Sequence, residues 1–174
     1  MSIRHDQIYR EIQDIFKYNT VLMIGLKERG AFFLRKFVEN NYTVDVVEVF
    51  GPNVMWLKTQ KELPIRIVWQ KDITKFDTLD RRWDIVFWWH GPEHISKQHL
   101  APTLSKLEAA TNKLVIIGCP WGIYEQPPIE GNPHEEHRNH IETNDLESIG
   151  YLTHTLGERN KESGHILAYK RLSG

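Results

Sequence analysis

Several acidic side chains stand at the ends of apolar runs, where they could contact a bound molecule. Glu48 lies within the apolar run at residues 44–50, and an acid buried there without a partner would be costly. It follows Gly25 by 23 positions, close to the roughly 20-residue spacing of dinucleotide and related nucleoside sites. A carboxylate at a strand end can accept hydrogen bonds from both hydroxyls of a ribose. The alternative is an ion pair with a nearby Lys or Arg at the strand edge.

A second acid, Asp72, follows the apolar run at residues 65–70 in the stretch KDITKF. It could face the amino group of an adenine, while Ile73 offers the ring an apolar surface. The alternative is that Asp72 caps a turn or a helix, a role that Asp often has. Taken alone, Asp72 favours the cap.

Two histidine clusters have side chains of the types that bind metals or move protons. HGPEH at residues 90–94 has histidines four apart, but Gly91 and Pro92 between them disfavour a regular helix. HEEHRNH at residues 134–140 has histidines three apart, one short of the spacing in zinc proteases. With neither pattern intact we predict no metal site, and a metal-dependent hydrolase is a remote alternative. The second cluster can instead form the polar first turns of a helix that turns Ile141, Leu146 and Ile149 toward the core.

The composition is that of one ordinary globular domain, residues 1–174, with 40% hydrophobic and 26% charged residues. A net charge of −1 gives no reason to expect a nucleic acid or an anionic membrane as partner. Cys119 is the only cysteine, which excludes an intramolecular disulfide and favours a reducing cytoplasm. No signal segment is recognisable, and no apolar run is long enough to span a membrane.

Apolar runs alternate with amphipathic segments along most of the chain. Strands are predicted at residues 20–25, 44–50, 65–70, 83–90 and 113–119. Helices are predicted within residues 1–19, from 31 to 39, around 56–57 and at 96–110; the first carries an apolar stripe of Ile8, Ile12 and Phe16. Parallel neighbours need crossover connections, so this order predicts a mainly parallel sheet with helices on both faces.

The end of the chain breaks this alternation. Residues 151–155 and 165–169 are strand-like and flank the polar stretch GERNKESG, which predicts a closing antiparallel hairpin. Before them, residues 118–134 form a long predicted loop rich in Pro and Gly.

These features together resemble class I S-adenosylmethionine-dependent methyltransferases over residues 18–171. VLMIGLKERG stands at the family's first glycine motif, DVVEVF at its ribose-binding acid, KDITKF at its adenine-contacting acid and WDIVFWWHGPEHI at its fourth-strand motif. The resemblance implies a Rossmann-like methyltransferase fold with a seven-stranded sheet and S-adenosylmethionine as cofactor. It implies a cofactor site made of Gly25, Leu26, Lys27, Gly30, Glu48, Val49, Asp72, Ile73 and His90.

The resemblance also implies an acceptor site. The 118–134 loop would overhang it, with Glu93, Trp121 and Tyr124 at the substrate, and His94, His134 and His137 as candidate bases for the acceptor proton. Trp88 and Trp89 fit ordinary core packing, with the wall of the cofactor pocket as the alternative.

The glycine motif departs from the family pattern at two positions. Met23 replaces an acid that normally lies two positions before the first glycine, and Lys27 replaces the middle glycine. From the resemblance we predict a cytoplasmic enzyme that methylates an oxygen or nitrogen atom of a small molecule such as a sugar or another metabolite. A non-catalytic methyltransferase-like binding protein is the alternative.

Overall fold

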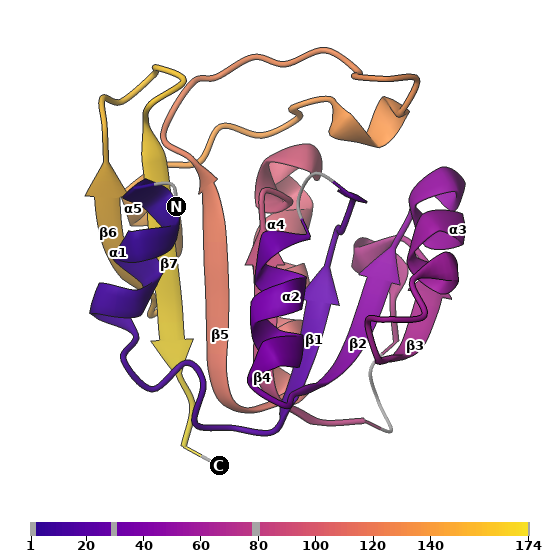
Figure 1. The fold of residues 1–174 in the computed structure, drawn as a ribbon. Coiled ribbons are helices and arrows are strands. Elements are labelled where there is room, and N and C mark those ends of the chain that lie inside the picture. The colour runs from indigo at the N-terminus through magenta and orange to yellow at the C-terminus, as the bar shows by residue number, and fades with distance from the viewer. Residues whose placement is uncertain (1–2, 29–30, 78–80, 174) are drawn as a thin grey trace.

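The computed structural model describes residues 3–28, 31–77 and 81–173. In this part of the chain, seven strands form one sheet in the order β3-β2-β1-β4-β5-β7-β6 (Figure 1). The strands are β1 (Thr20–Ile24), β2 (Thr43–Glu48), β3 (Ile65–Gln70), β4 (Trp83–Trp89), β5 (Thr111–Pro120), β6 (Leu152–Leu156) and β7 (His165–Arg171). The predicted seven-stranded Rossmann-like sheet is confirmed.

The first five strands run parallel, so their carboxyl ends meet at one edge of the sheet. The chain order reverses between the neighbours β1 and β4, which makes this the point where ligands bind in open sheets of this type. β7 runs antiparallel to both β5 and β6, which confirms the predicted closing hairpin.

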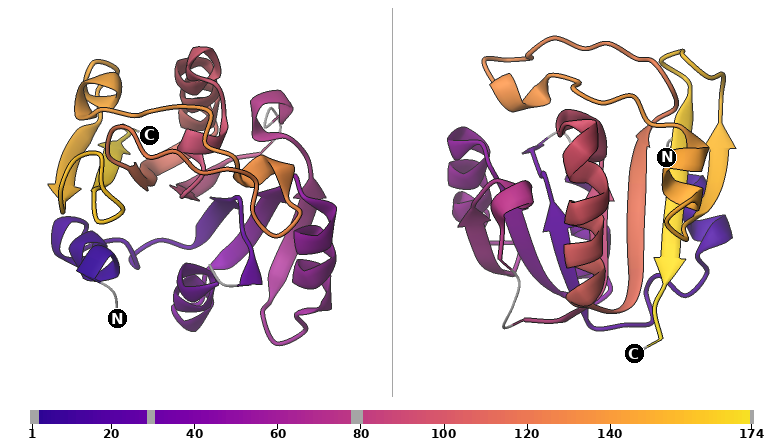
Figure 2. Two further views of the ribbon diagram at one scale, coloured as in Figure 1. Left: turned by 90° about the horizontal axis from the view of Figure 1, so that it is seen from above. Right: turned by 180° about the vertical axis from the view of Figure 1, so that it is seen from behind.

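Helices cover both faces of the sheet, as predicted (Figure 2). One face carries α1 (Ile3–Glu11), α2 (Phe32–Glu39) and α3 (Gly51–Thr59), whose apolar residues join one core cluster. The other face carries α4 (Lys97–Ala109) and α5 (Thr143–Glu147), which bury Leu100, Leu104 and Leu107 of the first helix and Leu146 of the second. Because both faces are covered, the central strands β1 and β4 are almost wholly buried and read as continuous apolar runs.

The N-terminal helix is shorter than predicted. It ends at Glu11 rather than near residue 19, and the backbone then turns through bonds three residues apart, with the Ile15 N–H donating to Ile12 and the Lys17 N–H to Asp14. The Asp14 carboxylate accepts hydrogen bonds from Arg171 at 2.7 and 2.8 Å and thereby ties the turn to the end of β7. The apolar stripe was real, but a tertiary contact replaces the last turns of the helix.

The predicted helix over the second histidine cluster does not form. Residues 133–135 make a single 3-10 turn, and α5 begins only at Thr143. The N–H groups of Arg138 and Asn139 donate to the Glu93 carbonyl, and that of His137 donates to Gln126. These amides are used by distant segments, so no helical ladder is available and the three histidines share no helical face.

Strand ends also differ slightly from the prediction. β2 ends at Glu48 because α3 begins at Gly51, and β4 ends at Trp89 because His90 adopts a positive φ of 51°.

Among the described residues, no helix combines the length and apolar character needed to cross a membrane.

Candidate functional site

A cavity of about 1020 Å³ lies at the carboxyl ends of β1, β2 and β4. Its floor comes from the strand ends, and its roof comes from the segment after β5, which arches over the top of the sheet (Figure 1). This volume lies at the upper end of the usual range for ligand pockets.

The turn after β1 is shaped by Gly25, whose φ of +67° suits glycine better than a residue with a side chain. Its N–H donates to Val47 at 2.9 Å, which holds the turn against the end of β2. Leu26 and Lys27 continue the turn and line the cavity.

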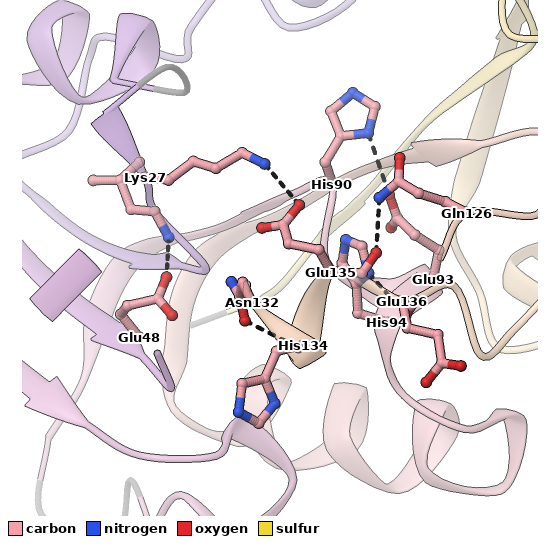
Figure 3. Close-up of polar contacts among 11 residues, drawn as sticks. Lys27, Glu48, His90, Glu93, His94, Gln126, Asn132, His134, Glu135 and Glu136 are labelled. Carbon is pink, nitrogen blue, oxygen red and sulfur yellow. Dashed lines mark hydrogen bonds and ion pairs between the residues drawn. The ribbon is translucent and has the colours of Figure 1, made fainter. Parts of the chain in front are cut away.

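Glu48 lies directly beneath this turn, at the end of β2. Its Oε2 accepts the Leu26 N–H at 2.9 Å and its Oε1 accepts the Phe50 N–H at 2.7 Å (Figure 3 shows the first bond). Only 5% of the residue is exposed, and burial raises the pKa of the carboxyl although these backbone N–H groups oppose the shift. In the described chain no Lys or Arg pairs with it, so the ion pair expected under the alternative is not found.

Asp72 caps the short 3-10 helix Ile73–Lys75, as the alternative prediction held. Its Oδ1 accepts the Thr74 N–H at 2.9 Å and the Thr74 hydroxyl at 2.8 Å. Asp72 and Ile73 nevertheless both line the cavity, and Ile73 presents an apolar side chain there. The cap leaves Oδ2 outside these two bonds.

The end of β4 carries a buried acid beneath a histidine. His90 Nδ1 lies 3.2 Å from Glu93 Oε1 (Figure 3), and the His90 N–H donates to the Gly118 carbonyl at 2.7 Å. Burial raises the pKa of Glu93, but the hydrogen bond and charge of His90 outweigh it and hold the pKa below its usual range. Gly91 lets the chain pass the Trp88 indole, since a Cβ at this position would lie 1.9 Å from Nε1.

The roof is tied to the rest of the site by side chains of the segment after β5. Lys27 Nζ lies 2.6 Å from Glu135 Oε2, and Gln126 Nε2 donates to the Glu135 carbonyl at 2.7 Å (Figure 3). Lys27, at the degenerate glycine position, therefore joins the β1 turn to the roof across the cavity. Its side chain is 39% exposed, so the ion pair itself adds little stability.

The three candidate bases all line the cavity. His94 Nδ1 lies 3.1 Å from the Glu136 carbonyl, and His137 Nδ1 lies 2.5 Å from the Tyr124 carbonyl. Burial lowers the pKa of His137. His134 is exposed, and its N–H donates to the Asn132 side chain at 2.9 Å.

Only some of the other predicted site residues line the cavity. Val49, Glu93 and His90 line the cavity, whereas Gly30 lies outside the described residues. Trp121 and Tyr124, predicted at the substrate, do not line it: Trp121 packs against the core beside α5, and the Tyr124 ring lies 5.5 Å from that of His137. Trp88 and Trp89 have both of the predicted roles, since they pack in the core and also line the cavity.

Several cavity residues, among them Asn53, Asn132 and Glu135, had no sequence signal. Asn53 reaches the site from α3, where its side chain helps to stabilise the charged form of Glu48. Asn132 and Glu135 come from the roof. Glu135 is 108 positions from its partner Lys27, a separation that no local pattern reveals.

Comparison with known proteins shows similarity in structure without similarity in sequence. No protein-family model and no curated protein matched the chain. Among solved structures, N-methyltransferase NodS from Bradyrhizobium japonicum WM9 is similar with a TM-score of 0.70 and 12% identity, over 98% of this chain and 95% of that one. The DhpI–SAH complex has a TM-score of 0.70 and 14% identity, over 98% and 84% of the two chains.

A third similar structure is magnesium protoporphyrin IX methyltransferase (ChlM) from Synechocystis PCC 6803 with bound SAM. Its TM-score is 0.63 at 13% identity, over 95% of this chain and 79% of that one. The chain has the fold of these methyltransferases. The fold implied by the sequence resemblance is therefore confirmed, and the ligands in the similar structures are nucleoside cofactors of the predicted kind.

Proposed function

We propose that this protein binds S-adenosylmethionine and transfers its methyl group to an oxygen or nitrogen atom of a small molecule. The observation that carries the proposal is the position of Glu48. It is a buried acid at the end of β2, beneath a glycine turn, on the wall of a large cavity at the point where the strand order reverses.

The residues present fit such a cofactor. An ionised carboxylate has about four acceptor positions, and the Leu26 and Phe50 N–H groups use one on each oxygen of Glu48. The Asn53 side chain and the Val49 N–H also stabilise its charged form, so ribose hydroxyls would donate to a remaining position or take the place of Asn53. Ile73 offers an adenine an apolar surface, and its neighbour Asp72 also lines the cavity, with Oδ2 4.0 Å from Lys75 Nζ. The similar structures of ChlM with bound SAM and DhpI with SAH support the same assignment.

The other end of the cavity fits a small acceptor. When bound, adenosylmethionine supplies an electrophilic methyl group; the sulfur keeps the electron pair of the broken bond, and the acceptor atom forms the new bond and releases its proton. His94, His134 and His137 line the cavity and have the side-chain chemistry to take that proton. The roof limits access, which favours a small molecule, such as a sugar or another metabolite, over a polymer.

Calorimetry with adenosylmethionine and adenosylhomocysteine tests the proposal. We expect one molecule of either to bind per chain, and no binding by the folded protein would refute the proposal. Release of adenosylhomocysteine with a panel of hydroxyl- and amine-bearing metabolites then separates an enzyme from the non-catalytic alternative. Binding without turnover on any of them would favour the alternative, to which Met23 and Lys27 in the glycine motif point.

A further inference from the structure

A cluster of three side chains in the cavity has potential ligand atoms that the proposed adenosylmethionine site leaves unused. Glu93, His94 and His137 each present a potential ligand atom, and these three atoms lie within 4.8 Å of one another. Glu93 is 2% exposed, and among the described residues its Oε2 has no hydrogen-bond partner. A buried carboxylate oxygen without a partner is costly unless something else binds it.

Both imidazoles have one ring nitrogen bonded to a backbone carbonyl. His94 Nδ1 faces the Glu136 carbonyl at 3.1 Å, and His137 Nδ1 faces the Tyr124 carbonyl at 2.5 Å. A carbonyl only accepts, so each Nδ1 must be the donor and a neutral ring carries its lone pair on Nε2. A ring N–H bonded to a carbonyl is the usual outer-shell arrangement of metal-binding histidines.

The acid has outer-shell support as well. His90 Nδ1 lies 3.2 Å from Glu93 Oε1, which fixes the carboxylate and leaves Oε2 available (Figure 3). The backbone carbonyl of Glu93 accepts the Arg138 and Asn139 N–H groups at 2.8 and 3.1 Å. These bonds hold the segment that carries His137 against the segment that carries Glu93 and His94.

We propose that Glu93, His94 and His137 bind a divalent transition-metal ion such as Zn²⁺, with its remaining coordination positions open to the cavity. Two imidazoles and one carboxylate suit Zn²⁺ or Mn²⁺, whereas Mg²⁺ and Ca²⁺ prefer oxygen ligands alone. Metal–ligand bonds of about 2.1 Å place tetrahedral ligand atoms roughly 3.4 Å apart. The atoms now within 4.8 Å would therefore approach by up to about 1.4 Å. His137 is on the roof segment, where such a shift needs no change in the sheet.

The metal ion would also restrict the chemical class of the methyl acceptor, an inference that rests on the proposed function. A metal ion lowers the pKa of a hydroxyl bound to it, so the proton can pass to solvent water before the methyl group is transferred. His94 and His137, as ligands of the ion, would then not act as bases. The site therefore favours an acceptor with a hydroxyl group over one with an amine.

Cobalt binding tests the metal site without any activity assay. Protein without a histidine tag is stripped with a chelator and titrated with Co²⁺, whose visible absorption reports bound nitrogen and oxygen ligands. We expect one Co²⁺ per chain, displaced by one equivalent of Zn²⁺ but not by an equal concentration of Mg²⁺. His137→Ala and Glu93→Gln should weaken binding by more than the roughly 10- to 100-fold that follows loss of an outer-shell partner.

His140→Ala is the matched control, because His140 belongs to the same HEEHRNH stretch but is exposed and does not line the cavity. It should bind Co²⁺ like the parent protein. Circular dichroism checks folding, and if Glu93→Gln fails to fold, His137→Ala on the roof still decides. Less than stoichiometric Co²⁺ in the folded parent protein, equal binding by His137→Ala, or equal loss in His140→Ala would overturn the proposal.

Calorimetry with adenosylhomocysteine on the same sample keeps the two proposals separate. Cofactor binding without metal binding would overturn the metal site and leave the proposed function intact. Metal binding without cofactor binding would do the reverse.

Discussion

Replacing Glu48 by Gln tests the cofactor site with little change in shape. Glu48 is 5% exposed, and its two oxygens accept the Leu26 and Phe50 N–H groups at 2.9 and 2.7 Å. A Gln has a single acceptor oxygen, and its NH₂ group can only donate. In the variant the NH₂ group replaces one of these oxygens, so one backbone N–H meets another donor, and a ribose hydroxyl that would donate to that oxygen loses its acceptor.

The expected loss follows from the kind of bond removed. Hydrogen bonds to charged groups contribute about 1.5–3 kcal/mol each, and every 1.4 kcal/mol is a tenfold change in affinity. Loss of one such bond should weaken adenosylhomocysteine binding by roughly 10- to 150-fold. Calorimetry at neutral pH measures the change, with circular dichroism to show that the variant is folded.

Glu48→Gln should also change how the affinity for adenosylhomocysteine depends on pH. Burial raises the pKa of Glu48, so the carboxylate is protonated at a higher pH than an exposed Glu would be. Protonation removes acceptor positions from the ribose site. The affinity of the parent protein should therefore fall as the pH drops toward this raised pKa, while that of Glu48→Gln should change much less.

Glu39→Gln on α2 is the matched control, because Glu39 is exposed and does not line the cavity. It should bind adenosylhomocysteine like the parent protein. The reasoning fails if folded Glu48→Gln binds within twofold of the parent, or if both proteins lose affinity in parallel at low pH.

Three further predictions concern the stability of the fold. Leu104 is completely buried on α4, so Leu104→Ala should lower the free energy of unfolding by about 2–5 kcal/mol in urea titrations. Asp45 is also completely buried and accepts the Trp83 indole N–H at 2.8 Å, so Asp45→Ala should lower it by about 1–3 kcal/mol, since that N–H loses its acceptor. The Arg171 guanidinium holds the pKa of the Asp14 carboxyl well below its usual range, so the folded state binds fewer protons than the unfolded state at acid pH. This contribution is present above about pH 4 and is lost as the pH falls further, and Asp14→Asn should flatten that decline.

Exposed positions provide the controls for these three variants. Met55 is 64% exposed, so Met55→Ala should change the free energy of unfolding by no more than about 0.5 kcal/mol. Asp6→Asn, at an exposed position on α1, should leave the acid-induced decline in place. A Leu104→Ala protein as stable as Met55→Ala, an unchanged Asp45→Ala, or a pH profile of Asp14→Asn that matches the parent would each contradict the corresponding argument.

The sheet and the floor of the site could be predicted because their signals are local. Buried parallel strands are continuous apolar runs, so the positions of Gly25 and Glu48 at strand ends followed from the alternation of elements. The closing hairpin was visible in the same way. These patterns depend on which positions are buried, and the apolar or polar type of each residue in the sequence indicates that directly.

The roof could not be predicted, because its conformation depends on distant partners. The amides of Arg138 and Asn139 bond to the Glu93 carbonyl instead of forming the helix that the histidine spacing favoured. The approach of His94 to His137 and of Lys27 to Glu135 likewise requires the folded chain. The early end of α1 has the same cause, since the contact of Asp14 with Arg171 joins residues 157 positions apart.

A crystal structure of the protein with adenosylhomocysteine tests the central claim most directly. We predict ribose hydroxyls within hydrogen-bonding distance of Glu48, with the adenine against Ile73 and the sulfur directed toward the end of β4 at His90. Density for the nucleoside outside this cavity, or an empty cavity at saturating ligand, would contradict the assignment.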